Sequence, residues 1–311
     1  MKNRRKLFPR LLVPVLVLAL LFSLTACSTF ETKVVRAARK ATKLENQRVD
    51  WTVDLGIELG MLGQSMDMGM ELDGTLDLQH DPTVGRGDFG LELSEGTMAE
   101  GLYYFALDDG AVRVYFSMDG GNSWTVQSYE VEMQTSSRSI FDVDRETLSL
   151  LRTIAATFEE TGTETVEGSE AVVYSGFIRG TELKTVLDAT QALESIAASL
   201  GTDPDALQIE EIGDIPVTLA IDQKSGMIVR VTMDLSGLMD SLWPFLMQVA
   251  MQTSGAQEDD SLGLGGVTQM MNLMKVSFSE FLITVELYDF NSVGSVVIPA
   301  EVIENAVEVS G

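Results

Sequence analysis

The chain has 311 residues, of which 45% are apolar, so it can bury a sizeable core and is not globally disordered. It holds 47 acidic residues against 21 basic ones, and a body with this charge repels nucleic acid, which excludes a DNA- or RNA-binding role. One cysteine and one histidine exclude an internal disulfide and a metal site built from Cys or His ligands, and they disfavour a His-dependent catalytic triad.

Residues 1–26 form a predicted signal peptide. All the bases of this segment lie in its first ten residues, and the stretch from Leu11 to Leu24 is almost wholly apolar. A membrane-spanning helix needs about 20 apolar residues, so this shorter stretch is typical of a cleaved export signal. Once it is removed, 16 bases face 47 acids, which gives residues 27–311 a net charge of −31.

The sequence Leu24-Thr25-Ala26-Cys27 resembles the bacterial lipobox. This resemblance implies cleavage before Cys27 and a diacylglycerol on its sulfur, which anchors the chain on the extracytoplasmic face of the cell membrane. The alternative is an ordinary signal peptide followed by an incidental cysteine. A lipid-anchored protein outside the cytoplasm also accounts for the lack of a second cysteine, because a spare thiol would be oxidised there.

Residues 27–46 are interpreted as a lipidated tether that is helical from residue 30 onwards. The bases of this helix are Lys33, Arg36, Arg39, Lys40 and Lys43. Apolar residues from Val34 to Ala41 repeat with helical spacing, so the helix can lie on the body of the protein. The alternative is that its basic face contacts the membrane surface.

Residues 47–311 are predicted to form one domain, an α+β fold that is mainly antiparallel β. From Trp51 to Val126, apolar residues alternate with polar or acidic ones, and turn signals interrupt the pattern at 63–64, 81–83, 108–110 and 119–122. This pattern predicts an antiparallel meander with one apolar and one acidic face. The many glycines favour strong curvature, and Gly74 on the apolar side of its strand predicts a bend or bulge.

Helical spacing returns at residues 145–159 and 181–200, and predicted hairpins follow at 164–178 and 215–235. A last long strand is predicted over residues 276–288, which brings the expected total to about ten strands. Residues 236–274 form an insertion before this strand. Its ends are rich in Met and Leu, and its middle is polar, acidic and rich in glycine.

The order of these elements, with the segments at 171–180, 215–231 and 288–302, resembles bacterial lipoproteins of the LolA/LolB and LppX/LprG kind. The resemblance implies a half-barrel, in which a single strongly curved sheet has helices packed on its concave apolar face. It also implies an apolar cavity that holds the acyl chains of lipids, and hence a lipid carrier or presenter in the cell envelope. The alternative on the same fold is an envelope sensor or protein-interaction module.

We expect neither enzyme activity nor a cofactor or metal. The candidate ligand contacts are apolar residues of the meander and of the insertion: Met66, Met68, Met70, Leu242, Phe245, Leu246 and Met274. Methionine adapts its shape to apolar ligands, although filling of a core is the alternative role. The insertion at 236–274 is interpreted as a lid over the cavity mouth, and the competing interpretation is an amphipathic segment that contacts the membrane.

Residues Ser117, Asp119, Gly121, Ser123 and Trp124 fit the Asp-box pattern S-x-D-x-G-x-[ST]-W. In this motif the Asp accepts backbone N–H groups within a hairpin turn, and the Trp packs beneath it. Sialidase-like propellers hold several copies, whereas this chain has one. We therefore predict a structural turn, and a carbohydrate-active protein is a remote alternative.

Overall fold

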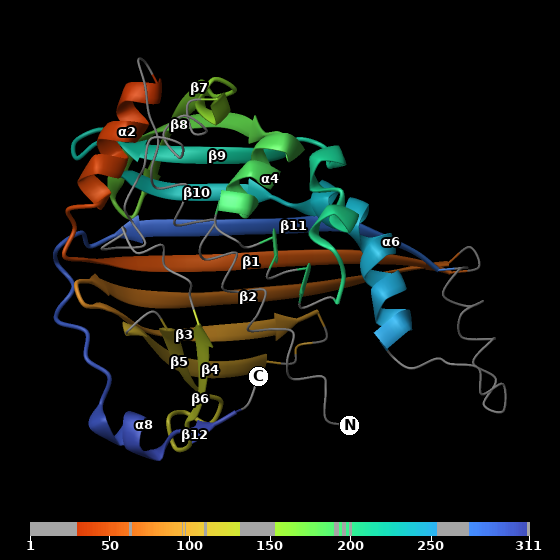
Figure 1. Ribbon diagram of the computed structural model, residues 1–311. Coiled ribbons are helices and arrows are strands. Elements are labelled where there is room, and N and C mark those ends of the chain that lie inside the picture. The colour runs from red at the N-terminus through yellow and green to blue at the C-terminus, as the bar shows by residue number, and fades with distance from the viewer. Residues whose placement is uncertain are drawn as a thin grey trace.

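The computed structural model describes residues 30–61, 64–94, 96, 98–108, 111–130, 153–189, 193–194, 197–198, 201–253 and 274–309. Twelve strands form one sheet in the order β12-β6-β5-β4-β3-β2-β1-β11-β10-β9-β8-β7 (Figure 1). Only the short pairing of β12 with β6 is parallel. The sheet is open, because β12 and β7 form its two edges.

The strands form two meanders, β1 to β6 and β7 to β11, with β12 at one edge. Their bounds are β1 (Asn46–Met61), β2 (Gln64–His80), β3 (Thr83–Leu93), β4 (Met98–Asp108), β5 (Ala111–Ser117), β6 (Thr125–Glu130), β7 (Glu159–Val166), β8 (Ser169–Ile178), β9 (Ile215–Asp222), β10 (Ile228–Asp234), β11 (Met274–Tyr288) and β12 (Val307–Glu308). The first and last long strands join the two meanders, since β1 pairs with β11 from Arg48↔Tyr288 to Met61↔Met274.

Alternation along the strands gives the sheet one apolar face. A single row of paired residues crosses eight strands on this face: Tyr174, Leu219, Val231, Val285, Trp51, Gly74, Phe89 and Gly101. The larger cluster of buried apolar residues includes this row from Tyr174 to Trp51, together with helical residues such as Val34 and Leu183. The core therefore lies between this face and the helices.

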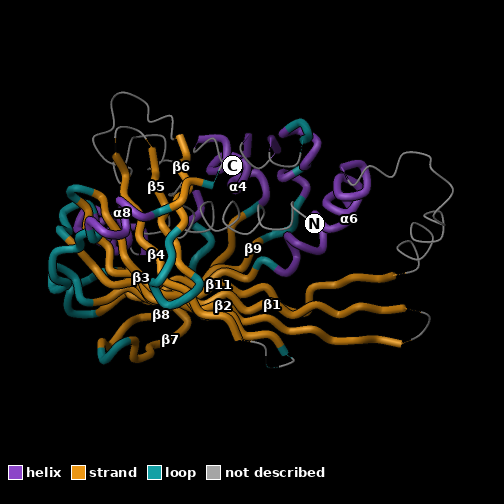
Figure 2. The backbone as a smooth tube through the Cα atoms, turned by 90° about the horizontal axis from the view of Figure 1, so that it is seen from below, coloured by secondary structure: helices purple, strands orange, loops and turns teal. Residues whose placement is uncertain are grey.

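The described helices range from short 3-10 turns to an α-helix of 18 residues. They are α2 (Phe30–Ala41), α4 (Gly180–Ala189), the 3-10 turns η1 (Pro204–Leu207) and η2 (Ile209–Glu211), α6 (Ser236–Thr253) and α8 (Ala300–Asn305), and residues 153–155 are also helical. Figures 1 and 2 show α4 and α6 on the same side of the sheet. On α2, Phe30 stacks on Phe158 with a ring separation of 4.9 Å and contacts Tyr174 of β8 at 4.6 Å.

Glycines on the apolar face make room for aromatic rings of the neighbouring strand. A Cβ on Gly74 would lie 2.6 Å from the ring of Trp51, which is directly opposite on β1. The same arrangement pairs Gly85 with Phe105, Gly87 with Tyr103, and Gly101 with Phe89. Of the bend or bulge expected at Gly74, the bulge is wrong, because β2 keeps a regular register with both β1 and β3 there. Gly74 is needed for space rather than for a break in pairing.

The opposite face is polar and charged. At its centre, Asp77 is nearly buried and accepts hydrogen bonds from Arg48 at 2.7 Å and from Arg86 at 2.8 Å. Burial alone would raise the pKa of Asp77, but the hydrogen bonds from both guanidinium groups outweigh it and hold the pKa below its ordinary value. This acid is therefore a fixed ionic link between three strands and not part of a solvated stripe.

The remaining predicted elements are found with altered ends. The hairpins at 164–178 and 215–235 are β7–β8 and β9–β10. The helix predicted over 145–159 falls mostly outside the described residues, and its predicted end is wrong because β7 begins at Glu159. The hydroxyl of Thr157 explains this end, since it exchanges two hydrogen bonds with the backbone of Phe177 on β8. The C-terminal α8 and β12 were not predicted.

Candidate apolar binding site

The outer ends of β1, β2 and β11 (residues 55–61, 64–70 and 274–281) extend beyond the neighbouring strands. Pairing of β3 with β2 stops at Met70, and pairing of β10 with β11 stops at Leu282. Figure 2 shows the three strands projecting from the body of the sheet. The apolar face therefore continues here on a three-stranded ribbon.

Apolar side chains occupy this face of the outer ends without interruption. Leu55 pairs with Met70, Ile57 with Met68, and Leu59 with Met66, all in regular register. On the other side of β1, Ile57 pairs with Phe278 and Leu59 with Val276. Since Leu55 has the same parity as the buried Trp51, these residues prolong the core face of the sheet.

Exposure increases along this row towards the tip of the strands. Phe278 is buried, and Leu55, Ile57, Leu59 and Met70 are half-buried. Met68 is 43% exposed and Met66 is 59% exposed. The outer ends thus present adaptable thioether side chains to solvent on a face that is buried closer to the body of the sheet.

Helix α6 packs beside the outer end of β11. Trp243 contacts Phe278 edge-on with a ring separation of 5.5 Å. Leu238 and Leu242 are partly buried and pack against the core cluster. Helix α6 therefore covers part of the apolar face beside β11, on one side of the sheet's exposed methionine row.

Helix α6 also covers the free edge of β11. The backbone N–H of Phe278 donates to Asp240 Oδ1 at 2.8 Å, and that of Phe281 donates to Ser236 Oγ at 3.0 Å. These donors lie on the side of β11 where β10 has ended, so side chains of α6 replace the missing strand. The sequence pattern offered no sign of this, because it depends on residues about 40 positions apart.

The structure places three of the seven predicted ligand contacts together and the side chain of a fourth on α6. Met66, Met68 and Met70 share one face of β2, and Leu242 lies on α6 beside the core. The side chains of Phe245, Leu246 and Met274 lie outside the described part of the structure. Sequence reasoning missed Trp243, Val276 and Phe278 as members of the same surface, because their proximity depends on the pairing of β1 with β11.

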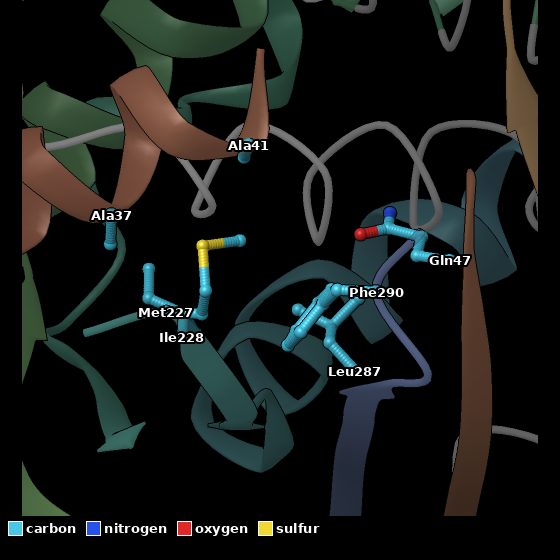
Figure 3. Close-up of a pocket in the computed structure, with 7 residues that line it drawn as sticks. All are labelled: Ala37, Ala41, Gln47, Met227, Ile228, Leu287 and Phe290. Carbon is cyan, nitrogen blue, oxygen red and sulfur yellow. The ribbon is translucent and has the colours of Figure 1, made fainter. Parts of the chain in front are cut away.

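A small pocket lies under the C-terminal half of α2. It is lined by Ala37, Ala41, Gln47, Met227, Ile228, Leu287 and Phe290 (Figure 3). Its volume of about 10 Å³ has room for a single water molecule. This pocket is too small for an acyl chain.

The Asp-box residues form a closed hydrogen-bonded turn between β5 and β6. Asp119 accepts hydrogen bonds from the backbone N–H of Ser123 at 2.9 Å and from the Ser117 hydroxyl at 2.7 Å. Trp124 Nε1 donates to the Gly121 carbonyl at 3.0 Å. Hydrogen bonds from the Ser123 hydroxyl and then from its backbone lower the pKa of Asp119 to about 2. The carboxylate is therefore committed to the turn.

Other titratable groups do not assemble into a reactive centre within the described ranges. Burial lowers the pKa of His80, and burial raises the pKa of Tyr103, whose hydroxyl donates to the Thr75 carbonyl at 3.0 Å. The described residues contain no group of three or more His, Cys, Asp or Glu side chains that could hold a metal ion. No described helix is both long and apolar enough to cross a membrane.

No protein-family model and no curated protein matches the sequence. Among solved structures, LprF from Mycobacterium bovis is similar, at 13% identity and a TM-score of 0.39, over 89% of this chain and 99% of that one. LppX from Mycobacterium tuberculosis is similar at 12% identity and a TM-score of 0.34, over 90% of this chain and 98% of that one. A putative outer membrane lipoprotein-sorting protein domain from Vibrio parahaemolyticus is similar at 10% identity and a TM-score of 0.17. That similarity covers 82% of this chain and 90% of that one.

These structures are of the two kinds that the sequence resembles, LppX-like lipoproteins and lipoprotein-sorting proteins. The TM-scores are low, so the similarity assigns neither a ligand nor a partner to this chain.

Proposed function

We propose that this chain is a membrane-anchored bacterial lipoprotein that binds acyl chains of a lipid on the apolar face of its sheet, without catalysing a reaction. The observation that carries the proposal is the exposure of Met66 and Met68 on the same face of the sheet that is buried in its core. In this proposal the sheet is the concave wall of a half-barrel, and α2, α4 and α6 are its helical cover. The protein carries or presents lipid in the cell envelope.

The proposed site has the length and chemistry of an acyl chain. The row from Leu55 to Leu59 spans about 13 Å at roughly 3.3 Å per residue, and the half-buried Val53 extends it inwards to about 20 Å. No charged residue lies on this face of β1 or β2 over that span. Covering a methionine completely stabilises a complex by about 1.5–3 kcal/mol, so the two exposed side chains alone offer a useful part of the affinity.

The segment at 236–274 is proposed as the lid of this site. Leu238, Leu242 and Trp243 of α6 already flank the row, and two side chains of α6 are bonded to β11. A lid of this kind moves without breaking the sheet, because its contacts with the β11 edge are made by side chains alone. We test it by replacing residues 238–274 with a short Gly-Ser linker. Unchanged affinity and exchange rate of an acyl probe would reject the lid, and weaker vesicle association would favour membrane contact by this segment.

The anchor at Cys27 is part of the proposal, and residue 27 lies outside the described residues. Its support is the lipobox-like sequence and the short apolar stretch before it. We expect Cys27→Ala to abolish incorporation of a radiolabelled fatty acid and to leave the precursor uncleaved or unanchored. Label on the variant equal to that on the wild type would show that another residue is acylated.

The binding experiment compares two double substitutions that add the same charge. Met66→Glu with Met68→Glu places two carboxylates in the proposed site. Met98→Glu with Met118→Glu places two at exposed methionines elsewhere, since Met98 is 65% exposed on the opposite face and Met118 is 55% exposed within the Asp-box turn. We expect the first pair to weaken binding of a fluorescent fatty-acyl probe at least tenfold and the second to leave it within about twofold.

Equal effects of the two pairs would reject the site. Native mass spectrometry of the wild type, purified without detergent, adds an independent measurement. Co-purified lipid should be present on the wild type and on the Met98/Met118 variant, and reduced on the Met66/Met68 variant.

A protein-interaction module on the same fold is the second candidate. It is favoured by the pocket beneath α2, whose volume of about 10 Å³ leaves no room for lipid there. On β2, residues 64–68 also lie beyond Gly69, the last residue of this edge bonded to Ser94, so the edge can pair with a strand of a partner. Normal function in cells of a variant that binds no acyl probe would favour this candidate.

A further inference from the structure

A basic patch lies on α2 and the adjoining β9–β10 turn. Its residues are Lys33, Arg36, Arg39, Lys40, Lys43 and Lys224, all of them exposed. Lys40 Nζ donates to the carbonyl of Ser225, which places Lys224 of the turn beside the helix. These six residues are a large share of the 21 bases in a chain with 47 acids. The patch is thus a local reversal of the charge of the protein.

The opposite side of α2 is fixed to the core. Val34, Ala37 and Ala38 are at most 2% exposed. Phe30 stacks on Phe158 and contacts the ring of Tyr174. Lys33 lies over the ring of Tyr174 at 5.2 Å. The helix therefore cannot roll, and its basic side is held outward beside the ends of β9 and β10 (Figure 1).

Three of the bases are left without an acidic partner. Among the side chains that the structure describes, none forms an ion pair with Arg36, Arg39 or Lys43, whereas Arg48, Arg86, Arg179 and Arg230 each pair with a carboxylate. Neighbouring like charges on one side of a helix repel each other modestly, and an external anion that faces all three relieves this repulsion. This arrangement suits a partner that is anionic, flat and extended.

We infer that the basic patch docks the protein onto the anionic phospholipid headgroups of a bilayer. Phe30 is three residues from Cys27, so the start of α2 lies at most about 11 Å from the anchored sulfur along the chain. That reach is close to the Debye length of about 8–10 Å, within which each base near an anionic surface contributes attraction. The location beside the bilayer rests on the proposed lipidation of Cys27, but the preference for anionic lipid does not.

The patch sets the orientation of the whole molecule. With α2 against the headgroups, the acidic remainder of the chain is directed away from the negative surface. An anchor alone fixes the distance of the protein from the bilayer, and the patch fixes which end of the sheet faces it.

The test uses the full chain with Cys27→Ser, so that failure of lipidation and failure of the patch are separated. Co-sedimentation is measured with vesicles of neutral phosphatidylcholine and with vesicles that contain about one-third phosphatidylglycerol. The five bases of the export signal also favour anionic vesicles, so the patch is measured by the change in this affinity ratio between the parent chain and variants that keep the same signal. We expect a ratio of at least ten at about 0.1 M salt that falls towards one at about 1 M salt.

Two double variants complete the test. Arg39→Gln with Lys43→Gln should lower the ratio by up to roughly 30-fold, at about 1 kcal/mol per base. Arg113→Gln with Lys275→Gln removes the same charge from exposed positions on β5 and β11 and should leave the ratio within about twofold. Equal binding of the parent chain to both vesicles overturns the inference, as do equal losses in the two variants. Binding to an acidic polymer without any preference for anionic vesicles would assign the patch to another partner.

Discussion

Substitution of Gly74 by alanine tests whether glycine on the apolar face is needed for space. The new Cβ would lie 2.4 Å from the Asp88 carbonyl oxygen and 2.6 Å from Cζ2 of the buried Trp51. The first of these atoms belongs to the backbone of β3, so a change of rotamer cannot relieve both contacts. Overpacking of this kind costs about 1–3 kcal/mol, which exceeds the gain of about 0.4–1 kcal/mol from replacing a glycine in the unfolded chain.

Gly69→Ala is the matched control on the same strand, because its Cβ would meet only Ser94 Cβ at 3.9 Å. We expect Gly74→Ala to lower the free energy of unfolding by about 2 kcal/mol and Gly69→Ala to leave it unchanged or raise it slightly. In urea unfolding at constant m-value, the first change shifts the midpoint by roughly 1 M for an m-value of about 2 kcal/mol/M. Equal midpoints for the two variants would refute the steric explanation.

Three further predictions concern single side chains. Asp119→Asn should destabilise the turn near neutral pH. Because the folded pKa of Asp119 is depressed to about 2, the difference in stability from the wild type should shrink as the pH falls below about 4. Urea midpoints measured across pH test this. Asp240→Ala should speed hydrogen exchange at the Phe278 amide and in α6, with a loss of about 1–2 kcal/mol, whereas Asp188→Ala on α4 should not. Tyr103→Phe removes the donor to the Thr75 carbonyl and should lower the free energy of unfolding by about 1 kcal/mol in urea titrations; no change would show that water replaces it.

Local alternation was sufficient to predict the long strands and the common face of Met66, Met68 and Met70, but not the short β12. A period of two determines which side of a strand each residue occupies, and this information is present in a few neighbouring positions. The position of the turn at 119–122 followed from glycine and short polar residues for the same reason.

Contacts between distant segments were not predictable in this way. The pairing of β1 with β11 decides that Phe278 lies beside Ile57, and no local pattern encodes which of several similar strands will be neighbours. The role of Asp240 in covering an edge depends on that pairing, and so does the position of Trp243. At Gly74 the residue type was read correctly as exceptional, but its cause is a ring on the neighbouring strand, which only the register reveals.

The pairing of β1 with β11 also dictates an order of events in folding. Each meander can form from hairpins whose strands follow one another in sequence, and such local closures are fast. The junction between the meanders joins residues such as Asp50 and Tyr288, which are 238 positions apart. Until residues 274–288 have emerged, β1 remains an uncovered edge with a full row of unpaired backbone groups. A chain that emerges from its N-terminus must therefore keep its longest strands from pairing with other molecules until it is nearly complete.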